Sequence, residues 1–155
     1  MARPIASNTT VGRDELLEFI RPRHHVVLLT TRSDGAPQAS PVSAGVDAEG
    51  RLVVASYPDR AKVANARRDP RGAAVVLSDD WNGPWVQVHG RLEVVDLPDA
   101  LDAFVEYYRS IAGEHPDWDE YRAAMTTQGK CLLRLAIESW GPIATGGFPA
   151  RLADD

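Results

Sequence analysis

Residues 51–71, RLVVASYPDRAKVANARRDPR, carry the strongest fold signal in the sequence, because an apolar strand leads directly into a basic helix. Residues 52–55 form an unbroken apolar run, which is typical of a buried strand. A Pro-Asp pair then breaks the strand, and Asp59 is predicted to cap a helix over residues 60–68. Pro70 should end this helix, because proline disfavours the helical conformation in the residue before it.

The first turn of this helix favours a negatively charged group. Arg60 and Lys62 stand where unpaired backbone N–H groups and the positive end of the helix dipole attract anions, so a phosphate would fit. The alternative is a solvated basic helix face with no ligand. The basic residues comprise fifteen Arg and only two Lys, so Lys62 is not the default cation of this surface. That composition shifts the balance toward the phosphate site, and both alternatives stay open at this point.

The rest of the chain predicts a small barrel with added helices. Strands are expected at residues 25–31, 37–46, 51–56, 72–78, 85–95 and 131–137. Further helices are expected at residues 14–20, 98–111 and 117–127. The Gly/Pro-rich residues 141–149 should be irregular, either as a mobile tail that folds over a cofactor or, more economically, as a frayed terminus. The predicted fold class is therefore mainly β with α additions, a six-stranded antiparallel β-barrel in one domain over residues 1–155.

One strand and one turn carry side chains that would face a ligand. In residues 37–46, Gln38, Ser40 and Val42 share a face, and Pro41 lacks an N–H donor, so this strand should lie at an edge or carry a bulge. Trp81 and a second tryptophan flank the next turn, where they would stack on a flat ring system or fill the barrel mouth. Both alternatives stay open at this point.

Several function classes have no support in the sequence. The net charge of -5 and pI near 5.3 argue against nucleic-acid or anionic-membrane surfaces. Cys131 is the only cysteine, which excludes an intramolecular disulfide and a Cys-rich metal site, and the histidines lack metal-ligand spacing. Neither a GxSxG elbow nor a GxGxxG fingerprint occurs. The N-terminal residues have no apolar signal core, so we expect a cytoplasmic location.

A family resemblance rests on three segments. Residues 56–78, SYPDRAKVANARRDPRGAAVVLS, resemble the phosphate-binding segment of the split-barrel flavin proteins related to pyridoxamine 5′-phosphate oxidase. Residues 30–42, TTRSDGAPQASPV, and 107–125, YYRSIAGEHPDWDEYRAAM, extend the likeness over nearly the whole chain. The last string is similar to the actinobacterial branch that uses the deazaflavin coenzyme F-420. The resemblance implies an FMN-binding type of split barrel.

The resemblance also implies site residues. The cations matching the phosphate ligands of the family are Arg60 and Lys62. The other implied cofactor-binding residues are Ser56, Tyr57, Ala61, Asn65, Gln38, Ser40, Pro41, Val42, Asp79, Asp80, Trp81 and Gln87. Residues 38–42 would lie against the rings, and residues 79–87 would approach the rings or the tail of the cofactor, partly from the partner subunit of a homodimer. No metal is implied, and no catalytic proton donor can be named.

The activity implied is hydride transfer from the reduced deazaflavin to a conjugated electrophile such as an enone, lactone or quinone. Because the cofactor carries the difficult chemistry, no acid/base dyad needs to appear. Two alternatives remain open: an FMN-dependent oxidase or reductase on the same barrel, and a non-catalytic cofactor carrier or sensor. The partners expected are a second copy of the chain and a small-molecule substrate, with no nucleic acid and no membrane.

Overall fold

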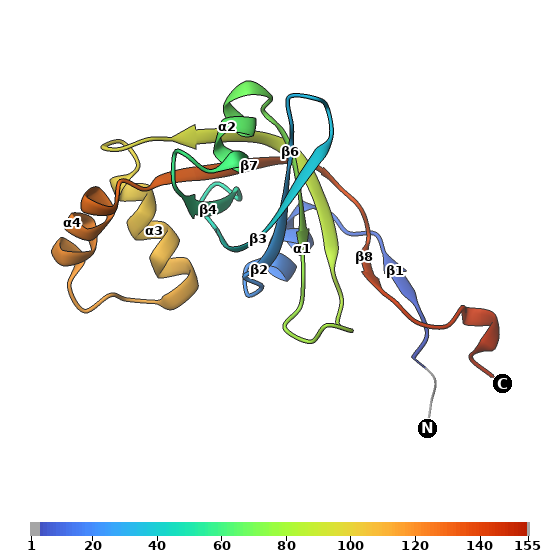
Figure 1. The fold of residues 1–155 in the computed structure, drawn as a ribbon. Coiled ribbons are helices and arrows are strands. Elements are labelled where there is room, and N and C mark those ends of the chain that lie inside the picture. The colour runs from blue at the N-terminus through green and yellow to red at the C-terminus, as the bar shows by residue number, and fades with distance from the viewer. Residues whose placement is uncertain (1–3, 155) are drawn as a thin grey trace.

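Six antiparallel strands close into a barrel at the centre of the molecule (Figure 1). The computed structural model describes residues 4–154. The barrel strands are β2 (His25–Thr31), β3 (Pro37–Val46), β4 (Leu52–Ser56), β5 (Arg71–Val76), β6 (Val86–Val95) and β7 (Cys131–Trp140). Their order around the barrel is β2-β3-β4-β7-β6-β5. The predicted fold class is confirmed, and β7 extends three residues beyond its predicted end.

Alternation along the strands fills the barrel. Val26 and Leu28 on β2 lie opposite Val76 and Ala74 on β5, and all four side chains are buried in the same core. Successive strand residues point to opposite sides, so the intervening side chains face outward. The alternation predicted for β3 follows the same rule, because Gln38, Ser40 and Val42 are partly buried while their neighbours are exposed.

Four helices surround this barrel in two groups. The helices α1 (Arg13–Ile20) and α2 (Ala61–Arg68) bury apolar side chains in the barrel core, including Leu16 and Val63. The helices α3 (Leu101–Ala112) and α4 (Trp118–Gln128) form a hairpin on the outside, at the left of Figure 1. The hairpin builds a second core against outward-facing residues of β4 and β7, such as Val53 and Leu132.

The predicted cap of α2 is wrong. The N-cap residue is Arg60, whose φ of -74° and ψ of 146° are extended, and its side chain makes no capping hydrogen bond. Asp59 lies one residue earlier, in a turn closed by Arg60 N–H donating to the Tyr57 carbonyl. The chain therefore enters the helix one residue later than the Pro-Asp pattern predicts. No side-chain carboxylate occupies the helix N-terminus as a result.

The chain ends form a ribbon that the sequence did not predict. β1 (Ser7–Thr9) pairs with β8 (Ile143–Thr145) in an antiparallel ladder that extends away from the barrel (Figure 1). Ser7 and Thr145 also share a 2.7 Å hydrogen bond between their hydroxyl groups. The expectation that residues 141–149 are simply frayed is therefore wrong for the β8 residues. Their strand character depends on a partner more than a hundred residues away.

One glycine on β6 allows a close strand crossing. The register between β6 and β7 shifts between His89 and Gly90, so Glu138 is skipped in the pairing. A Cβ atom on Gly90 would overlap the backbone carbonyl of Ala136, which only glycine avoids.

None of the helices within residues 4–154 combines the length and apolar character that spanning a bilayer requires.

Candidate functional site

The end of β4 and the start of α2 gather the predicted phosphate-binding residues. Ser56 ends β4, Tyr57 follows it, and Arg60 precedes the first turn of α2, which contains Ala61 and Lys62. Within residues 4–154, neither the Arg60 nor the Lys62 side chain forms an ion pair or a hydrogen bond. Arg60 lies only against the Tyr57 ring, 5.7 Å from its centroid. Two cations therefore stand unneutralised beside a helix N-terminus, as an anion site requires.

Lys62 is the more constrained of the two cations. Partial burial lowers the pKa of Lys62, and the neighbouring Arg60 charge lowers this pKa further. No carboxylate is among the groups that influence it. An anion bound here would therefore relieve an unfavourable concentration of positive charge.

A buried hydroxyl lies at the same strand end. The Ser56 side chain is 5% exposed, and its Oγ has no hydrogen-bond partner among the described residues. Buried polar atoms nearly always have partners, so an orphaned one indicates a missing water or ligand. This unpaired hydroxyl lies at the strand end from which the chain continues to Arg60 and Lys62.

A chain of hydrogen bonds joins this region to β3. The Asn65 side-chain amide on α2 donates to Thr30 Oγ1 at 3.1 Å, and Thr30 donates to Gln38 Oε1 at 3.0 Å. The Gln38 amide then donates to Ser40 Oγ at 2.7 Å. Arg68 holds the Asn65 side chain in place by donating to Asn65 Oδ1 at 2.7 Å. The two predicted clusters are therefore one connected unit.

The part of β3 that this chain of bonds reaches has an open edge. Residues 37–43 pair with β2, but β4 pairs only with residues 44–46 of β3. Ala44 N–H donates to the carbonyl of His24, the residue before β2, so by alternation the backbone groups of Ala39, Pro41 and Ser43 point away from β2. The Ser43 carbonyl accepts a 2.8 Å hydrogen bond from the Tyr107 hydroxyl. Pro41 therefore lies on a free strand edge, as predicted, and loses no ladder hydrogen bond.

Thr30 and Arg68 were not identified from the sequence. Thr30 is 3% exposed and lies at an inward position of the apolar strand β2. A polar side chain at an inward position is the signal that could have found it.

The remaining predicted residues lie at the other end of the barrel. Asp79 pairs with His25 at 3.3 Å, and Asp80 accepts a hydrogen bond from the Asn82 N–H, so both have roles in the β5–β6 loop. β5 runs from the end near α2 toward this loop, a length of roughly 20 Å for its residues. Figure 1 shows the loop and α2 at opposite ends of the sheet. One chain does not bring these residues to Arg60 and Lys62.

Trp81 and Gln87 line a groove of about 860 Å³ beside this loop. Trp81 is 83% exposed, and Val75, Leu77 and Trp85 give the groove an apolar wall. A groove of this size would hold a drug-sized molecule or part of another chain.

The groove continues into an apolar outer face of the barrel. The strand register aligns Pro41, Val27, Val75 and Gln87 in one outward row across β3, β2, β5 and β6. A second row contains Ala39, Leu29, Ala73 and His89. Val27, Leu29 and Val75 belong to neither core and are only half-buried within residues 4–154, so this face keeps some apolar surface.

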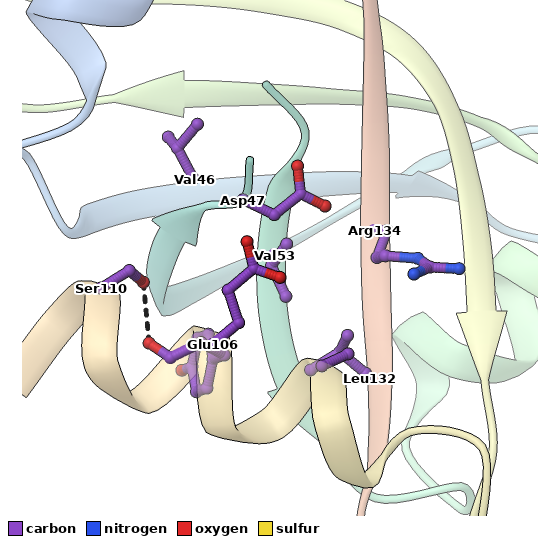
Figure 2. Close-up of a pocket in the computed structure, with 9 residues that line it drawn as sticks. Val46, Asp47, Val53, Glu106, Ser110, Leu132 and Arg134 are labelled. Carbon is purple, nitrogen blue, oxygen red and sulfur yellow. Dashed lines mark hydrogen bonds between the residues drawn. The ribbon is translucent and has the colours of Figure 1, made fainter. Parts of the chain in front are cut away.

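A small polar cavity lies elsewhere, between α3 and the barrel (Figure 2). Its volume is about 20 Å³, which is room for one water molecule. Asp47, Glu106 and Ser110 line it, while the Arg134 guanidinium points away from them in Figure 2 and pairs with Glu93 at 3.0 Å. Among the described residues, no group of three or more His, Cys, Asp or Glu is arranged to hold a metal ion. This cavity is too small for a cofactor.

The chain matches one protein family over most of its length. A family model described as pyridoxamine 5′-phosphate oxidase matches residues 13–144, which include the barrel, α2 and the α3–α4 hairpin. This family includes oxidoreductases, and its fold binds flavin-type cofactors.

Solved structures share the fold. A conserved hypothetical protein from Mycobacterium tuberculosis is 20% identical, with a TM-score of 0.73 over 90% of this chain and 89% of that chain. A protein described as an F-420 reductase is 24% identical, with a TM-score of 0.60 over 85% and 98% of the two chains. A heme-binding protein from Mycobacterium smegmatis is 19% identical, with a TM-score of 0.60 over 85% and 55%. At these identities the likeness establishes the split-barrel fold alone.

Proposed function

Because the chain belongs to the pyridoxamine 5′-phosphate oxidase family, we propose that it is an oxidoreductase that uses coenzyme F-420. The observation that carries the proposal is the unpaired Arg60 and Lys62 pair at the start of α2, connected through Asn65 and Thr30 to the open edge of β3. The F-420 reductase among the structures of the same fold supports this choice of coenzyme.

The residues of this chain would bind and orient the coenzyme. Arg60 and Lys62 would hold the phosphate, with backbone groups near Ser56, Tyr57 and Ala61 completing the anchor. The edge of β3, with Gln38, Ser40, Pro41 and Val42, would support the flat rings, since its backbone groups face an open side. The bound coenzyme would supply the chemistry, donating a hydride from the reduced deazaflavin to a conjugated enone, lactone or quinone.

The proposal includes a homodimer. The outward rows on β3, β2, β5 and β6 carry half-buried apolar side chains whose remaining surface a second copy would cover. Asp79, Asp80, Trp81 and Gln87 lie at the other end of β5 and β6 from the cations of the same chain. They would therefore approach the coenzyme held by the partner subunit. In this arrangement the exposed Trp81 side chain would pack against the partner subunit.

Binding measurements test the coenzyme and its anchor. Purified protein titrated with F-420 should change the fluorescence of the coenzyme, and the double variant Arg60→Ala with Lys62→Ala should weaken binding at least tenfold. A matched control removes two unpaired cations elsewhere, Arg21 and Arg151, and should leave affinity unchanged. Equal affinity of the double variant and the wild type would reject the anchor.

The same preparation separates the alternatives. FMN would satisfy the same two cations through its terminal phosphate, so a yellow protein that releases FMN on denaturation would replace F-420 in the proposal. Mixing the protein with reduced F-420 and a panel of quinones, enones and unsaturated lactones should oxidise the coenzyme faster than the protein-free mixture. Tight binding without any such turnover would leave a carrier or sensor instead of an enzyme.

A further inference from the structure

A third cation lies beside the candidate phosphate site. The Lys130 ammonium group is 5.7 Å from the centroid of the Tyr57 ring, the same distance as the Arg60 guanidinium. Both distances are within the range of cation–π contacts. The chain has only two lysines, and both lie at this end of the barrel.

Strand pairing explains how Lys130 reaches this position. Ser56 at the end of β4 pairs with Cys131 at the start of β7 in antiparallel register. Tyr57 directly follows β4 and Lys130 directly precedes β7, so continuing the register places these two residues opposite each other. The α3–α4 hairpin ends at Gly129, and Lys130 is the link between that hairpin and the barrel.

The three cations differ from six other basic residues of this chain in having no carboxylate partner. Arg51, Arg67, Arg71, Arg109, Arg122 and Arg134 each pair with a carboxylate. The Lys130 side chain, like those of Arg60 and Lys62, has no ion pair or hydrogen bond within residues 4–154. Arg60 and Lys130 therefore lie against one tyrosine, and Lys62 is near enough to Arg60 for that charge to lower its pKa, in a protein whose net charge is -5. Repulsion makes such a cluster unfavourable unless an anion neutralises it.

We propose that Lys130 is a cofactor-binding residue that holds a second negatively charged group, beyond the phosphate held by Arg60 and Lys62. This inference rests on the proposed function, and it concerns the part of the coenzyme that extends past the phosphate. The complete F-420 tail continues from its phosphate into glutamyl carboxylates, whereas FMN ends at the phosphate. Lys130 therefore selects for a coenzyme with a longer, multiply charged tail.

A purely structural role for Lys130 makes a different prediction. Lys130 follows the C-terminus of α4, where a cation interacts favourably with the helix dipole. The backbone N–H of Lys130 also donates to the Met125 carbonyl. In that case, removing the charge would lower the stability of the protein and would affect all ligands alike. Tail-specific binding is the readout that a structural role does not change.

The experiment compares two ligands in two variants. The wild type, Lys130→Gln and Lys130→Arg are titrated by fluorescence with complete F-420 and with F-420 from which the glutamyl residues have been removed. Lys130→Gln should weaken binding of the complete coenzyme about three- to tenfold, and binding of the tail-free form by less than about twofold. Lys130→Arg should bind both forms like the wild type, because it keeps the charge. Arg21→Ala is the control for loss of one unpaired cation elsewhere.

Two results would overturn the inference. One is an equal loss of affinity for both forms in Lys130→Gln, and the other is no loss for either form. A wild-type protein that binds neither form of F-420 would instead reject the proposed function. The two failures are therefore distinguishable, and neither readout depends on catalytic turnover.

Discussion

The Asn65 side chain on α2 donates a 3.1 Å hydrogen bond to Thr30 Oγ1 on β2, and both residues are buried. This bond fixes the helix that carries Arg60 and Lys62 against the strand that neighbours β3. Thr30 passes the connection to Gln38 at 3.0 Å. The candidate phosphate and ring sites are thereby held at a fixed separation.

Breaking this connection should cost stability. Thr30→Val leaves the Asn65 amide and Gln38 Oε1 without their Thr30 partner, and Asn65→Ala removes one of the two hydrogen bonds of Thr30 Oγ1 and one of those made by Arg68. Each variant should lower the free energy of unfolding by about 1–3 kcal/mol, because buried polar groups lose their hydrogen bonds. In the double variant the losses should be smaller than their sum by about 0.5–1.5 kcal/mol. Urea denaturation measures all three values.

Thr127→Val is the matched control for this cycle, because Thr127 is exposed on α4 and makes no side-chain hydrogen bond. It should change stability by less than about 0.5 kcal/mol. Strictly additive losses in the double variant would show that Asn65 and Thr30 do not act together.

The pKa of Lys62 should lie below the ordinary value of 10.5, since burial and the Arg60 charge both disfavour its charged form. Between the folded and unfolded pKa values the unfolded chain binds more protons, so this residue's contribution to stability rises with pH toward 10.5. The chain has only two lysines, so carbon-13 labelling at lysine Cε gives one side-chain signal from each of them. The variant Lys62→Met removes one signal and so assigns it. A pH titration by NMR then reads the pKa directly.

The same titration of the Lys62 pKa is repeated with inorganic phosphate added. An anion held by Arg60 and Lys62 should raise the pKa of Lys62, because it stabilises the charged ammonium group. Sodium chloride at equal ionic strength is the control. A pKa at or above 10.5 in the free protein, or one unmoved by phosphate, would contradict the anion site.

Val75→Glu should disrupt the proposed homodimer. Val75 lies outward between Val27 and Gln87 in the first apolar row, and a buried unpaired carboxylate there would be strongly unfavourable. The dimer dissociation constant should rise at least about a hundredfold, and sedimentation velocity would show monomers. Ala136→Glu on the exposed side of β7 is the control and should leave the dimer intact. A wild-type protein that sediments as a monomer would reject the dimer itself.

Gly90→Ala should strongly destabilise the barrel. The added Cβ would overlap the backbone carbonyl of Ala136, which cannot move away as a flexible side chain could. We expect a loss of about 2–3 kcal/mol in the free energy of unfolding. Gly146→Ala is the control, because a Cβ there meets no atom within 4 Å. Thermal unfolding compares the two, and equal melting temperatures would contradict the close crossing.

The sequence predicted those parts of the molecule that depend on local patterns. Apolar alternation located the barrel strands, and the adjacency of Arg60 and Lys62 located the cations, because neighbouring residues need no tertiary information. Lys130 was missed because its place beside Tyr57 depends on the pairing of β4 with β7. Its rarity as one of two lysines was the available signal. The helix start was misplaced by one residue because Arg60 adopts an extended conformation that composition does not specify.

Pro41 has a consequence for how the chain behaves before it meets any ligand. A bare strand edge is a template on which other chains can add strands and polymerise. Since Pro41 supplies no donor along the open side of β3, an incoming strand would find a gap in the ladder it needs. The opening can therefore stay accessible to a small flat molecule while remaining a poor seed for aggregation.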